Sequence, residues 1–420
     1  MSVDDQQSDD ATSDESDGVD GSGGLRGLIR GAGGILGGAF RSSGSVADRA
    51  ARSAQTARLV SSLEERVSQA RRERKIGKGT LRATHIAAYR GFGSNGQASF
   101  IVRVAEEPVV PDAASVVADP KVVRTNLRRF VALALPGVHL HLLFRGNRAD
   151  AHSDRHGYAR GSVVTGDLDP DWYEYHCVTE PDDRSEVPQI VTGEFLVPDQ
   201  RALAVVSDID DTVLRTGLTE GFVAFKNTIL RSPDSRRPVP GMATLYQGIR
   251  EANGAEAAPS FFYVSTGPWN LYEMITDFLE ARGFPKGVMF LTDWGPQDRY
   301  VMRSGKEHKR STLARLFASY PRTSFLLIGD SGQNDPLVYI EAAREFPGRV
   351  KAIIILDVGD HMAERAEELR AQEIELKSEG VPFHLVSDAS EAAVVLADYD
   401  IVGPELSDDV AAAVKREAVL

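Results

Sequence analysis

The sequence predicts an α/β protein: a Rossmann-like doubly wound parallel sheet from Leu203 onward, preceded by a small β-rich sandwich or barrel domain. After Leu203, apolar runs of strand length alternate with amphipathic stretches. Near-continuous apolar runs are typical of strands that are buried on both faces by helices. Between Thr80 and Pro198 the apolar runs are shorter, rich in β-branched and aromatic residues, and broken by Gly, Pro and Asp. That pattern indicates short strands joined by turns, as in a small antiparallel sandwich or barrel.

Length, charge and cysteine content limit the class of protein. The chain has 420 residues, which at roughly 150 residues per domain suggests several folded units. The formal net charge of -13 argues against non-specific binding to nucleic acid. Cys177 is the single cysteine, so an intramolecular disulfide is excluded and a reducing compartment is expected. The sequence shows neither a membrane-spanning apolar run nor a secretory signal, and we expect a cytoplasmic protein.

The polar N-terminal region is expected to lie outside the folded domains. Residues 1–45 form an acidic and Gly-rich tail whose first part has too few apolar residues to fold. The Gly-rich stretch 25–40 is predicted to be a linker, with a weak amphipathic membrane segment as the alternative. Residues 46–79 form a helical segment with a basic end, predicted as a solvated helix. Peripheral contact with an anionic membrane or a partner is the alternative.

The β-rich domain is expected to span residues 80–200. Its candidate strands are THIAAYRGF, ASFIVRVAE, PGVHLHLLF, GYARGSVV, WYEYHCV and EFLVP. Residues 120–133 are interpreted as a helical turn or an inserted connection. Histidines gather in this domain, and His139 and His141 share one face of a predicted strand; His152, His156 and His176 complete the set. A zinc site needs convergent ligands, and this spread does not predict one.

The α/β domain is expected to span residues 201–400, followed by a helical tail over 401–420. Its candidate strands are LAVVSDID, SFFYVST, GVMFLTDW, SFLLIGDS, VKAIIILDV and PFHLVSD. Several of them end in Asp, Ser or Thr. In open α/β sheets, ligands bind at the carboxyl ends of the strands, near a reversal of strand order. The sequence therefore predicts a site at this edge of the sheet.

The motif SDIDDT places Asp208, Asp210 and Thr212 directly after the first of these strands. Two carboxylates at this spacing can divide the work, one meeting a phosphorus atom and the other the leaving oxygen. A calcium loop beginning at Asp208 is excluded, because its sixth position is Val213 instead of Gly and its twelfth is Thr219 instead of Glu. A capping cluster without chemistry is the other alternative, but packed acids repel one another without a cation.

Three further strand ends or helix starts carry candidate residues. Ser265 ends the FFYVST run, where its hydroxyl could hold a phosphoryl oxygen or merely cap the next helix. Lys309 lies near the start of a helix, which is unfavourable for the helix dipole, so we expect a charge partner; a surface lysine is the alternative. FLLIGDSGQNDP runs into Asp330 and Asp335, a second acidic pair. Together these oxygens predict a cage for Mg²⁺.

The order of these four pieces resembles the haloacid dehalogenase superfamily of phosphohydrolases. More narrowly, the catalytic domain of the actin-patch-associated phosphatidate phosphatases and their bacterial relatives is similar over roughly residues 200–360. The motifs that carry the resemblance are SDIDDTVLRTG, YVSTGPWNLY, FPKG followed by LTDWG, HK, and LLIGDSGQNDPLVY. AYRGFG, HGYARG and VTGEFLVP resemble the β-rich region of that family more loosely. Thr266 and Gly267 stand where two serines are expected, which leaves the serine role with Ser265.

The resemblance implies a haloacid dehalogenase-like fold and a role for each motif residue. Asp208 is expected to attack phosphorus and form an aspartyl-phosphate. Asp210 is expected to protonate the leaving oxygen and then to act as base on the hydrolytic water. Ser265 and Lys309 are expected to bind the phosphoryl oxygens.

The same resemblance implies a Mg²⁺ cofactor that neutralises the charge of a phosphate before a carboxylate attacks it. Asp208, Asp330 and the backbone carbonyl of Asp210 are the expected ligands, and Asp335 completes the metal shell directly or through water. The expected reaction is hydrolysis of a phosphomonoester, with a lipid phosphate such as phosphatidate as the leading substrate. A soluble phosphomonoester, or a non-catalytic protein that recruits a membrane or partner, are the alternatives.

The sequence gives less specific predictions for the residues around these motifs. The segment between Thr212 and Phe261 is too short for a large cap domain, so a helical flap around GFVAFKNTILR is predicted. Trp269 and Trp294 lie near strand ends, where they either contact the substrate or pack against the core. Asp293 is interpreted as a site residue or a helix cap.

Overall fold

In the computed structural model the residues from Val67 onward belong to one compact unit. The structure describes residues 84–106, 132–181, 188–215, 237–252, 260–292, 305–358 and 363–419, and a short helical piece between residues 69 and 78. The predicted tail at 1–45 lies outside the described residues, as does most of the segment predicted at 46–79. Among the helices that are described, none has the length and apolarity needed to cross a bilayer.

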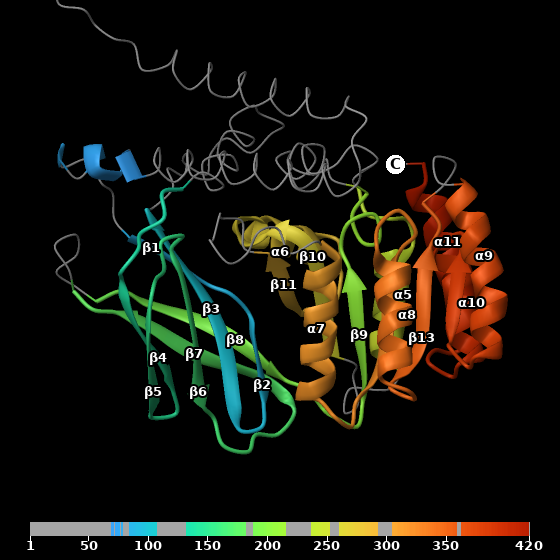
Figure 1. Ribbon diagram of the computed structural model, residues 1–420, viewed down its shortest axis with the longest axis horizontal. Helices are drawn as coiled ribbons and strands as arrows, with labels where there is room; N and C mark the ends of the chain where they lie inside the picture. The colour runs from blue at the N-terminus through green and yellow to red at the C-terminus, as the bar shows by residue number, and fades with distance from the viewer. Residues whose placement is uncertain are drawn as a thin grey trace, which may run out of the picture. The chain divides into compact units, whose positions relative to one another are not determined.

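A parallel six-stranded sheet forms the C-terminal part of the fold (Figure 1). All six apolar runs predicted after Leu203 form strands in it. The strands are β9 (Leu203–Asp208), β10 (Ser260–Pro268), β11 (Val288–Thr292), β12 (Ser324–Asp330), β13 (Val350–Leu356) and β14 (Phe383–Val386). Their order is β11-β10-β9-β12-β13-β14, and every pair is parallel. The order reverses between β9 and β12, which is where open α/β sheets bind ligands.

Helices pack on both faces of this sheet. They are α5 (Met242–Ala252), α6 (Tyr272–Ala281), α7 (Gly305–Ser319), α8 (Asp335–Glu345), α9 (Ala363–Ser378), α10 (Ala389–Asp398) and α11 (Leu406–Glu417), with a 3₁₀ turn, η4 (Trp269–Leu271), before α6. Val205 of β9 enters one core with side chains of α5, α6, α10 and α11. Its neighbours Ala204 and Val206 enter a second core with α7, α8 and α9. Alternate strand residues therefore face two cores, which explains why the strands are apolar throughout.

The β-rich region forms one eight-stranded sheet (Figure 1). Its strands are β1 (Thr84–Ala88), β2 (Gly91–Ser94), β3 (Gln97–Glu106), β4 (His139–Phe144), β5 (Asn147–His152), β6 (Tyr158–Val164), β7 (Asp171–Thr179) and β8 (Ile190–Val197). The order is β1-β3-β2-β8-β7-β4-β5, and β6 pairs with β3.

The predicted antiparallel arrangement is wrong for one pair, because β2 and β8 are parallel and the sheet is therefore mixed. That pair is short: Gly91 aligns with Phe195 and Phe92 with Leu196. A Cβ on Gly91 would lie 2.3 Å from the carbonyl oxygen of Ser99, so only glycine allows the close approach of β2 to β3. Such a short pairing has no periodic pattern of its own in the sequence.

The polar strand β5 was not predicted. Its residues, NRADAH, are mostly exposed and lack the apolar alternation of a strand. It is joined to β4 by a two-residue turn in which both Arg145 and Gly146 have positive φ, 45° and 85°. Such turns match the twist of a β-hairpin and fix its register.

The interior of the eight-stranded sheet is a separate core built from alternating residues of β3, β4, β7 and β8. Tyr175 of β7 lies opposite Gly193 of β8 and covers it, and its ring occupies the space that a Cβ would need. Cys177, two residues along β7, is fully buried in the same core. On the other face, Phe92 of β2 and Leu196 of β8 pack in the core shared with α7, α8 and α9.

Candidate active site

The predicted catalytic residues meet at the carboxyl ends of β9 and β12. Asp208 ends β9 and Asp330 ends β12, and the two strands are hydrogen-bonded neighbours. All the candidates are almost completely buried: Asp208, Asp210, Thr212, Ser265, Lys309, Asp330 and Asp335 are each at most 2% exposed. Burial of so many polar groups is costly unless they have partners or a ligand.

A tight turn after β9 brings Asp208 and Asp210 to the same edge of the sheet. Asp211, between Asp210 and Thr212, adopts a left-handed backbone with φ of 57°, which Asp and Asn tolerate better than most residues. The N–H groups of Val213 and Leu214 both donate to the carbonyl of Ile209, at 2.9 and 3.0 Å. The chain therefore turns back within five residues of the strand end.

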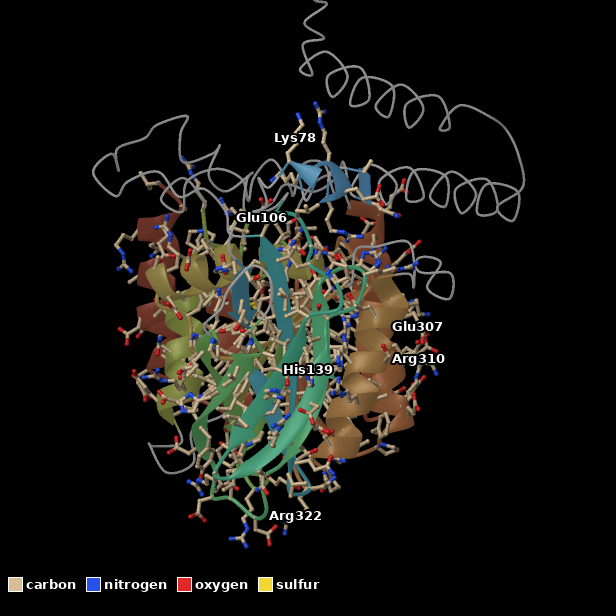
Figure 2. All side chains as sticks on the ribbon, turned by 90° about the vertical axis from the view of Figure 1, so that its left-hand side faces the viewer. Lys78, Glu106, His139, Glu307, Arg310 and Arg322 are labelled. Carbon is tan, nitrogen blue, oxygen red and sulfur yellow. The ribbon has the colours of Figure 1, made fainter. Side chains whose placement is uncertain are left out.

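Lys309 lies in the first turns of α7 and points into the site. Its neighbours Glu307 and Arg310 point outward instead (Figure 2). The Nζ atom of Lys309 is 2.7 Å from Oδ1 of Asp208 and also pairs with Oδ1 of Asp335. Burial alone would lower the pKa of Lys309, but the two carboxylates outweigh it and hold the pKa above its ordinary value. The lysine is thus a fixed positive charge between two acids.

Asp210 and Ser265 form a second pair. The hydroxyl of Ser265, in β10, donates to Oδ2 of Asp210 at 2.9 Å and accepts from the N–H of Gly267 at 2.9 Å. Burial raises the pKa of Asp210 to about 7, although the hydrogen bond from Ser265 opposes this. Oδ1 of Asp210 has no hydrogen-bond partner among the described residues. The carboxyl group can therefore carry a proton near neutral pH and has an oxygen from which to deliver it.

Asp330 is anchored by one of its oxygens only. Its Oδ1 accepts the N–H groups of Gly332 and Gln333, at 2.6 and 3.0 Å. Within the described part of the chain Oδ2 has no partner. Burial first, and then the charge of Asp335, raise the pKa of Asp330 to about 8.

The three acids Asp208, Asp330 and Asp335 have the geometry of a cation site. One carboxylate oxygen from each lies within 4.8 Å of the others. Oδ2 of Asp208, like Oδ2 of Asp330, is buried without a hydrogen-bond partner among the described residues. Buried, unpartnered carboxylate oxygens are ligands that Mg²⁺ prefers, and one lysine cannot balance three acids. The residues present therefore fit a divalent cation.

Asp335 takes part in more than this group of acids. Its Oδ2 accepts the backbone N–H of Asp330 at 3.3 Å, and its Oδ1 pairs with Lys309. It thus ties the end of β12 to α7 as well as contributing an oxygen to the acidic group.

Three residues that contact the site, Gln333, Tyr246 and Ser207, were not predicted from the sequence. The amide Nε2 of Gln333 lies 3.5 Å from the backbone carbonyl of Asp210, the oxygen that was expected to bind the metal. The Tyr246 hydroxyl on α5 lies 2.7 Å from Oγ of Ser207, which donates to the carbonyl of Asp208. Gln333 lies within the motif FLLIGDSGQNDP, so its place near the site could have been predicted. Tyr246 reads only as one apolar position of an amphipathic helix.

Trp269 is a packing residue. It is 5% exposed and stacks on Tyr89, with ring centroids 5.1 Å apart and planes 10° apart. Tyr89 also contacts Tyr272, so the three rings form one cluster. Trp294, Asp293 and the flap predicted around GFVAFKNTILR lie outside the described residues.

Comparison with known proteins singles out the segment that holds Asp208, Asp210, Ser265, Lys309, Asp330 and Asp335. Residues 203–357 match the family described as the catalytic domain of the phosphatidate phosphatase APP1. Phosphatidate phosphatase APP1 of Saccharomyces cerevisiae is 29% identical over 164 residues, which cover 39% of this chain and 27% of the yeast protein. An uncharacterised protein of Schizosaccharomyces pombe is 29% identical over 167 residues, or 40% of this chain and 27% of its own length.

The chain thus spans about a quarter of the length of the curated relatives it matches. Solved structures with some likeness include a 2,6-sialyltransferase of Photobacterium, which is 9% identical with a TM-score of 0.22, over 80% of this chain and 57% of the other. A likeness this distant carries no argument about the fold. Residues 203–357, with every acid and the lysine of the site, are similar to the catalytic domain of the APP1 phosphatidate phosphatases.

Proposed function

We propose that this chain is a Mg²⁺-dependent phosphoric monoester hydrolase with a haloacid dehalogenase-like catalytic domain. The observation that carries the proposal is the buried pair of Asp208 and Lys309 at the end of β9, with Asp210 hydrogen-bonded to Ser265 beside it. The match of residues 203–357 to the APP1 catalytic family supports the same reading. The strand order, with Asp208 and Asp330 at its reversal, supports the fold assignment.

Asp208 acts as the nucleophile. An oxygen of its carboxylate attacks phosphorus, a new P–O bond forms to Asp208, and the P–O bond to the leaving alcohol breaks. Lys309, 2.7 Å from Oδ1 of Asp208, holds the carboxylate in place and places its positive charge beside the transferred phosphoryl group.

Asp210 moves the protons. In the first step it gives its proton to the leaving alkoxide, a role that suits a pKa raised to about 7. In the second step its carboxylate takes a proton from water, which attacks the phosphorus of the aspartyl-phosphate. Inorganic phosphate leaves, and Asp208 and Asp210 return to their starting states. Ser265 orients Asp210 through its 2.9 Å hydrogen bond.

Asp208, Asp330 and the backbone carbonyl of Asp210 would hold the Mg²⁺ ion, with Asp335 completing the shell. Bound there, the ion would supply positive charge that lowers the repulsion between the carboxylate of Asp208 and a phosphate dianion. The buried, unpartnered oxygens of Asp208 and Asp330 support this assignment.

We propose a lipid phosphate such as phosphatidate as the substrate, met by a cytoplasmic enzyme in peripheral contact with a membrane. The support is the name of the matched family and of the Saccharomyces cerevisiae relative. No described side chain is assigned to an acyl chain, so the lipid preference rests on that similarity alone.

The test measures phosphate release from phosphatidate vesicles and from p-nitrophenyl phosphate, with Mg²⁺ or with EDTA. Asp208→Asn is expected to lower the rate by about 10³-fold or more, because it removes the nucleophile. Asp210→Asn is expected to lower it by about 10² to 10⁴-fold. Asp211→Asn is the matched control, because Asn tolerates its left-handed backbone, and it should retain most of the activity.

The outcomes separate the alternatives. Mg²⁺-dependent release from vesicles that Asp208→Asn abolishes supports the full proposal. Release from the soluble ester alone keeps the mechanism and rejects the lipid. Equal rates for Asp208→Asn and the wild type would reject the mechanism, and a well-folded protein without release from either substrate would favour a non-catalytic recruiting role.

A further inference from the structure

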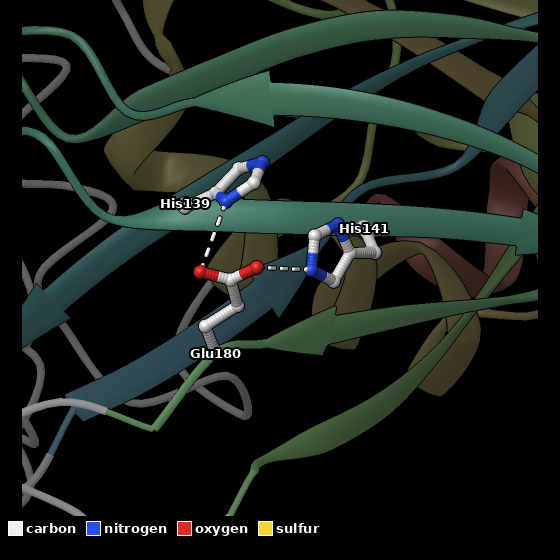
Figure 3. A group of neighbouring side chains, drawn as sticks. All are labelled: His139, His141 and Glu180. Atoms are coloured by element: carbon white, nitrogen blue, oxygen red, sulfur yellow. Dashed lines mark hydrogen bonds and ion pairs between the residues drawn. The ribbon is translucent and has the colours of Figure 1, made fainter.

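Two histidines and a glutamate converge on the eight-stranded sheet, far along the sequence from the catalytic motifs (Figure 3). Nδ1 of His139 lies 3.2 Å from Oε2 of Glu180, and Nε2 of His141 lies 3.0 Å from Oε1 of the same carboxylate. His139, labelled in Figure 2, is half-buried, and His141 is buried. The sequence placed His139 and His141 on one face of a strand but did not predict a convergent set of ligands; strand pairing adds Glu180 to the two histidines.

The pairing of β4 with its two neighbours builds the cluster. His139 and His141 are two residues apart on β4, so their side chains share one face. On one side, Leu140 aligns with Thr179 of β7, which places Glu180 next to His139. On the other side, the β4–β5 hairpin aligns His141 with Asp150. Each residue is therefore fixed by the register of a strand pair.

The carboxylate of Asp150 lies beside the ring nitrogens of His139 and His141 that face away from Glu180. Its Oδ1 lies 2.7 Å from Nδ1 of His141 and 3.5 Å from Nε2 of His139. In protein metal sites, a histidine ligand usually donates its second N–H to a carboxylate, which sets the tautomer and the ring orientation. Here the Asp150 carboxylate is hydrogen-bonded to Nδ1 of His141 and lies 3.5 Å from Nε2 of His139, which leaves the nitrogens beside Glu180 to act as electron-pair donors.

We propose that His139, His141 and Glu180 form a zinc site, separate from the acidic Mg²⁺ site. Metal–ligand distances of about 2.0 to 2.2 Å place the donor atoms of a tetrahedral zinc site about 3.3 Å apart. The His139–Glu180 and His141–Glu180 distances of 3.2 and 3.0 Å, which run to different oxygens of the carboxylate, are close to that spacing, and one donor atom from each of the three residues lies within 4.8 Å of the others. Two imidazoles and a carboxylate favour zinc or a similar transition metal over Mg²⁺. Three protein ligands leave the fourth position open to water or another ligand.

Arg148 is the group that zinc would have to displace. Its guanidinium lies 3.4 Å from Nε2 of His141 and 3.0 Å from Oδ1 of Asp150. The side chain is 53% exposed, so it can swing into solvent without opening the core. Its removal is therefore expected to strengthen zinc binding.

The test uses the full chain, stripped of metal with a chelator and then titrated with Zn²⁺ in excess Mg²⁺, which occupies the acidic site. Zinc per chain is measured by mass spectrometry of the metal, and Co²⁺ in place of Zn²⁺ reports four-coordinate geometry through its visible spectrum. His139→Gln changes a half-buried ligand and Glu180→Gln an exposed one, so both should fold. His176→Gln, an exposed histidine on β7 outside the cluster, is the matched control.

The wild type and His176→Gln are expected to bind a single zinc ion per chain, and His139→Gln and Glu180→Gln to lose it. Asp150→Asn should weaken binding by about 10 to 100-fold, as loss of a supporting carboxylate does elsewhere. Arg148→Ala should bind more tightly than the wild type. Equal zinc content in the wild type, His139→Gln and Glu180→Gln, with unchanged circular dichroism, would overturn the proposal and leave the cluster as a network of ion pairs. The Asp208→Asn variant should keep its zinc, which separates this result from any failure of the phosphatase assignment.

Discussion

Lys309 lies between the buried carboxylates of Asp208 and Asp335, and its removal would leave both without a positive partner among the described residues. Breaking a buried ion pair by deleting one partner typically costs about 3 to 5 kcal/mol. We therefore expect Lys309→Met to lower the free energy of unfolding of the metal-free protein by about that amount, as measured by urea denaturation.

Lys306→Met provides the matched control on the same helix. Lys306 pairs with Glu341 at 2.8 Å, but both side chains are about a third exposed, so its loss should cost about 1 kcal/mol or less. Similar losses for the two variants would mean that Lys309 does not carry the charge balance of the site. Added Mg²⁺ should restore part of the stability of Lys309→Met only, because a cation can replace the missing charge.

In the proposed mechanism, the hydrogen bond from Ser265 helps to set the pKa of Asp210, the general acid. This hydrogen bond favours the ionised carboxylate and so lowers the pKa of Asp210, which burial has raised to about 7. The rate should fall as the pH rises through that pKa, since a general acid must be protonated. In Ser265→Ala the hydrogen bond is lost, and the falling limb of the pH–rate profile should move to higher pH.

Ser260→Ala, at the opposite end of β10, should leave that limb in place. A limb that stays at the same pH in Ser265→Ala would assign it to another group, such as the substrate phosphate.

The motif residues of the site were predictable because each stands at a strand end or helix start with an unusual chemical type. Four buried acids and a buried lysine have no place in an ordinary core, so their motifs already pointed to a ligand. Partners such as Tyr246 could not be predicted. Its hydroxyl reaches Ser207 only through the packing of α5 on the sheet, which one sequence does not encode as a local pattern.

The packing of β8 against β7 requires a glycine at position 193, because the ring of Tyr175 covers it. A Cβ on Gly193 would lie 2.4 to 2.6 Å from the ring carbon and hydroxyl atoms of Tyr175, a distance that requires the ring to move. Gly193→Ala is therefore expected to destabilise the protein by about 1 to 3 kcal/mol, which thermal or urea unfolding would measure. Thr192→Ala, one residue away and exposed, should have little effect. An unchanged stability in Gly193→Ala would show that Tyr175 relocates freely.

Strand prediction succeeded where burial imposed a pattern and failed where it did not. The six strands of the parallel sheet are covered on both faces, so each is a continuous apolar run. β5 is polar because one of its faces meets solvent, and only its turn, Arg145 and Gly146, marked a hairpin. The cluster of His139, His141 and Glu180 was not predicted, since it depends on the register of β4 with β5 and β7.

The acidic site also sets how the stability of the metal-free protein depends on pH. Burial raises the pKa of Asp210 to about 7 and of Asp330 to about 8, from an ordinary value of 3.8. Between the ordinary and raised values, the folded chain keeps protons that the unfolded chain has released, so the free energy of unfolding falls as pH rises. The contribution of these groups is fully present below about pH 4 and lost by about pH 8.

Thermal unfolding in EDTA should show this fall between pH 5 and pH 8 on the order of 1 kcal/mol or more. In Asp330→Asn the fall should be smaller, because one of the titrating groups is absent. Mg²⁺ should raise the melting temperature most at pH 8, where the folded carboxylates are free to bind it. A steeper fall in Asp330→Asn than in the wild type would contradict the assignment.

Because Cys177 is the single cysteine of the chain, its reaction with thiol reagents reports on one buried position. This only cysteine of the chain is buried in β7, and burial raises its pKa to about 12. The thiolate is the form that reacts, so alkylating reagents are blocked both by the core around the sulfur and by its proton. Reaction at this position requires β7 to separate from its neighbours. The rate of alkylation therefore measures how often the eight-stranded sheet opens under native conditions, without any engineered label.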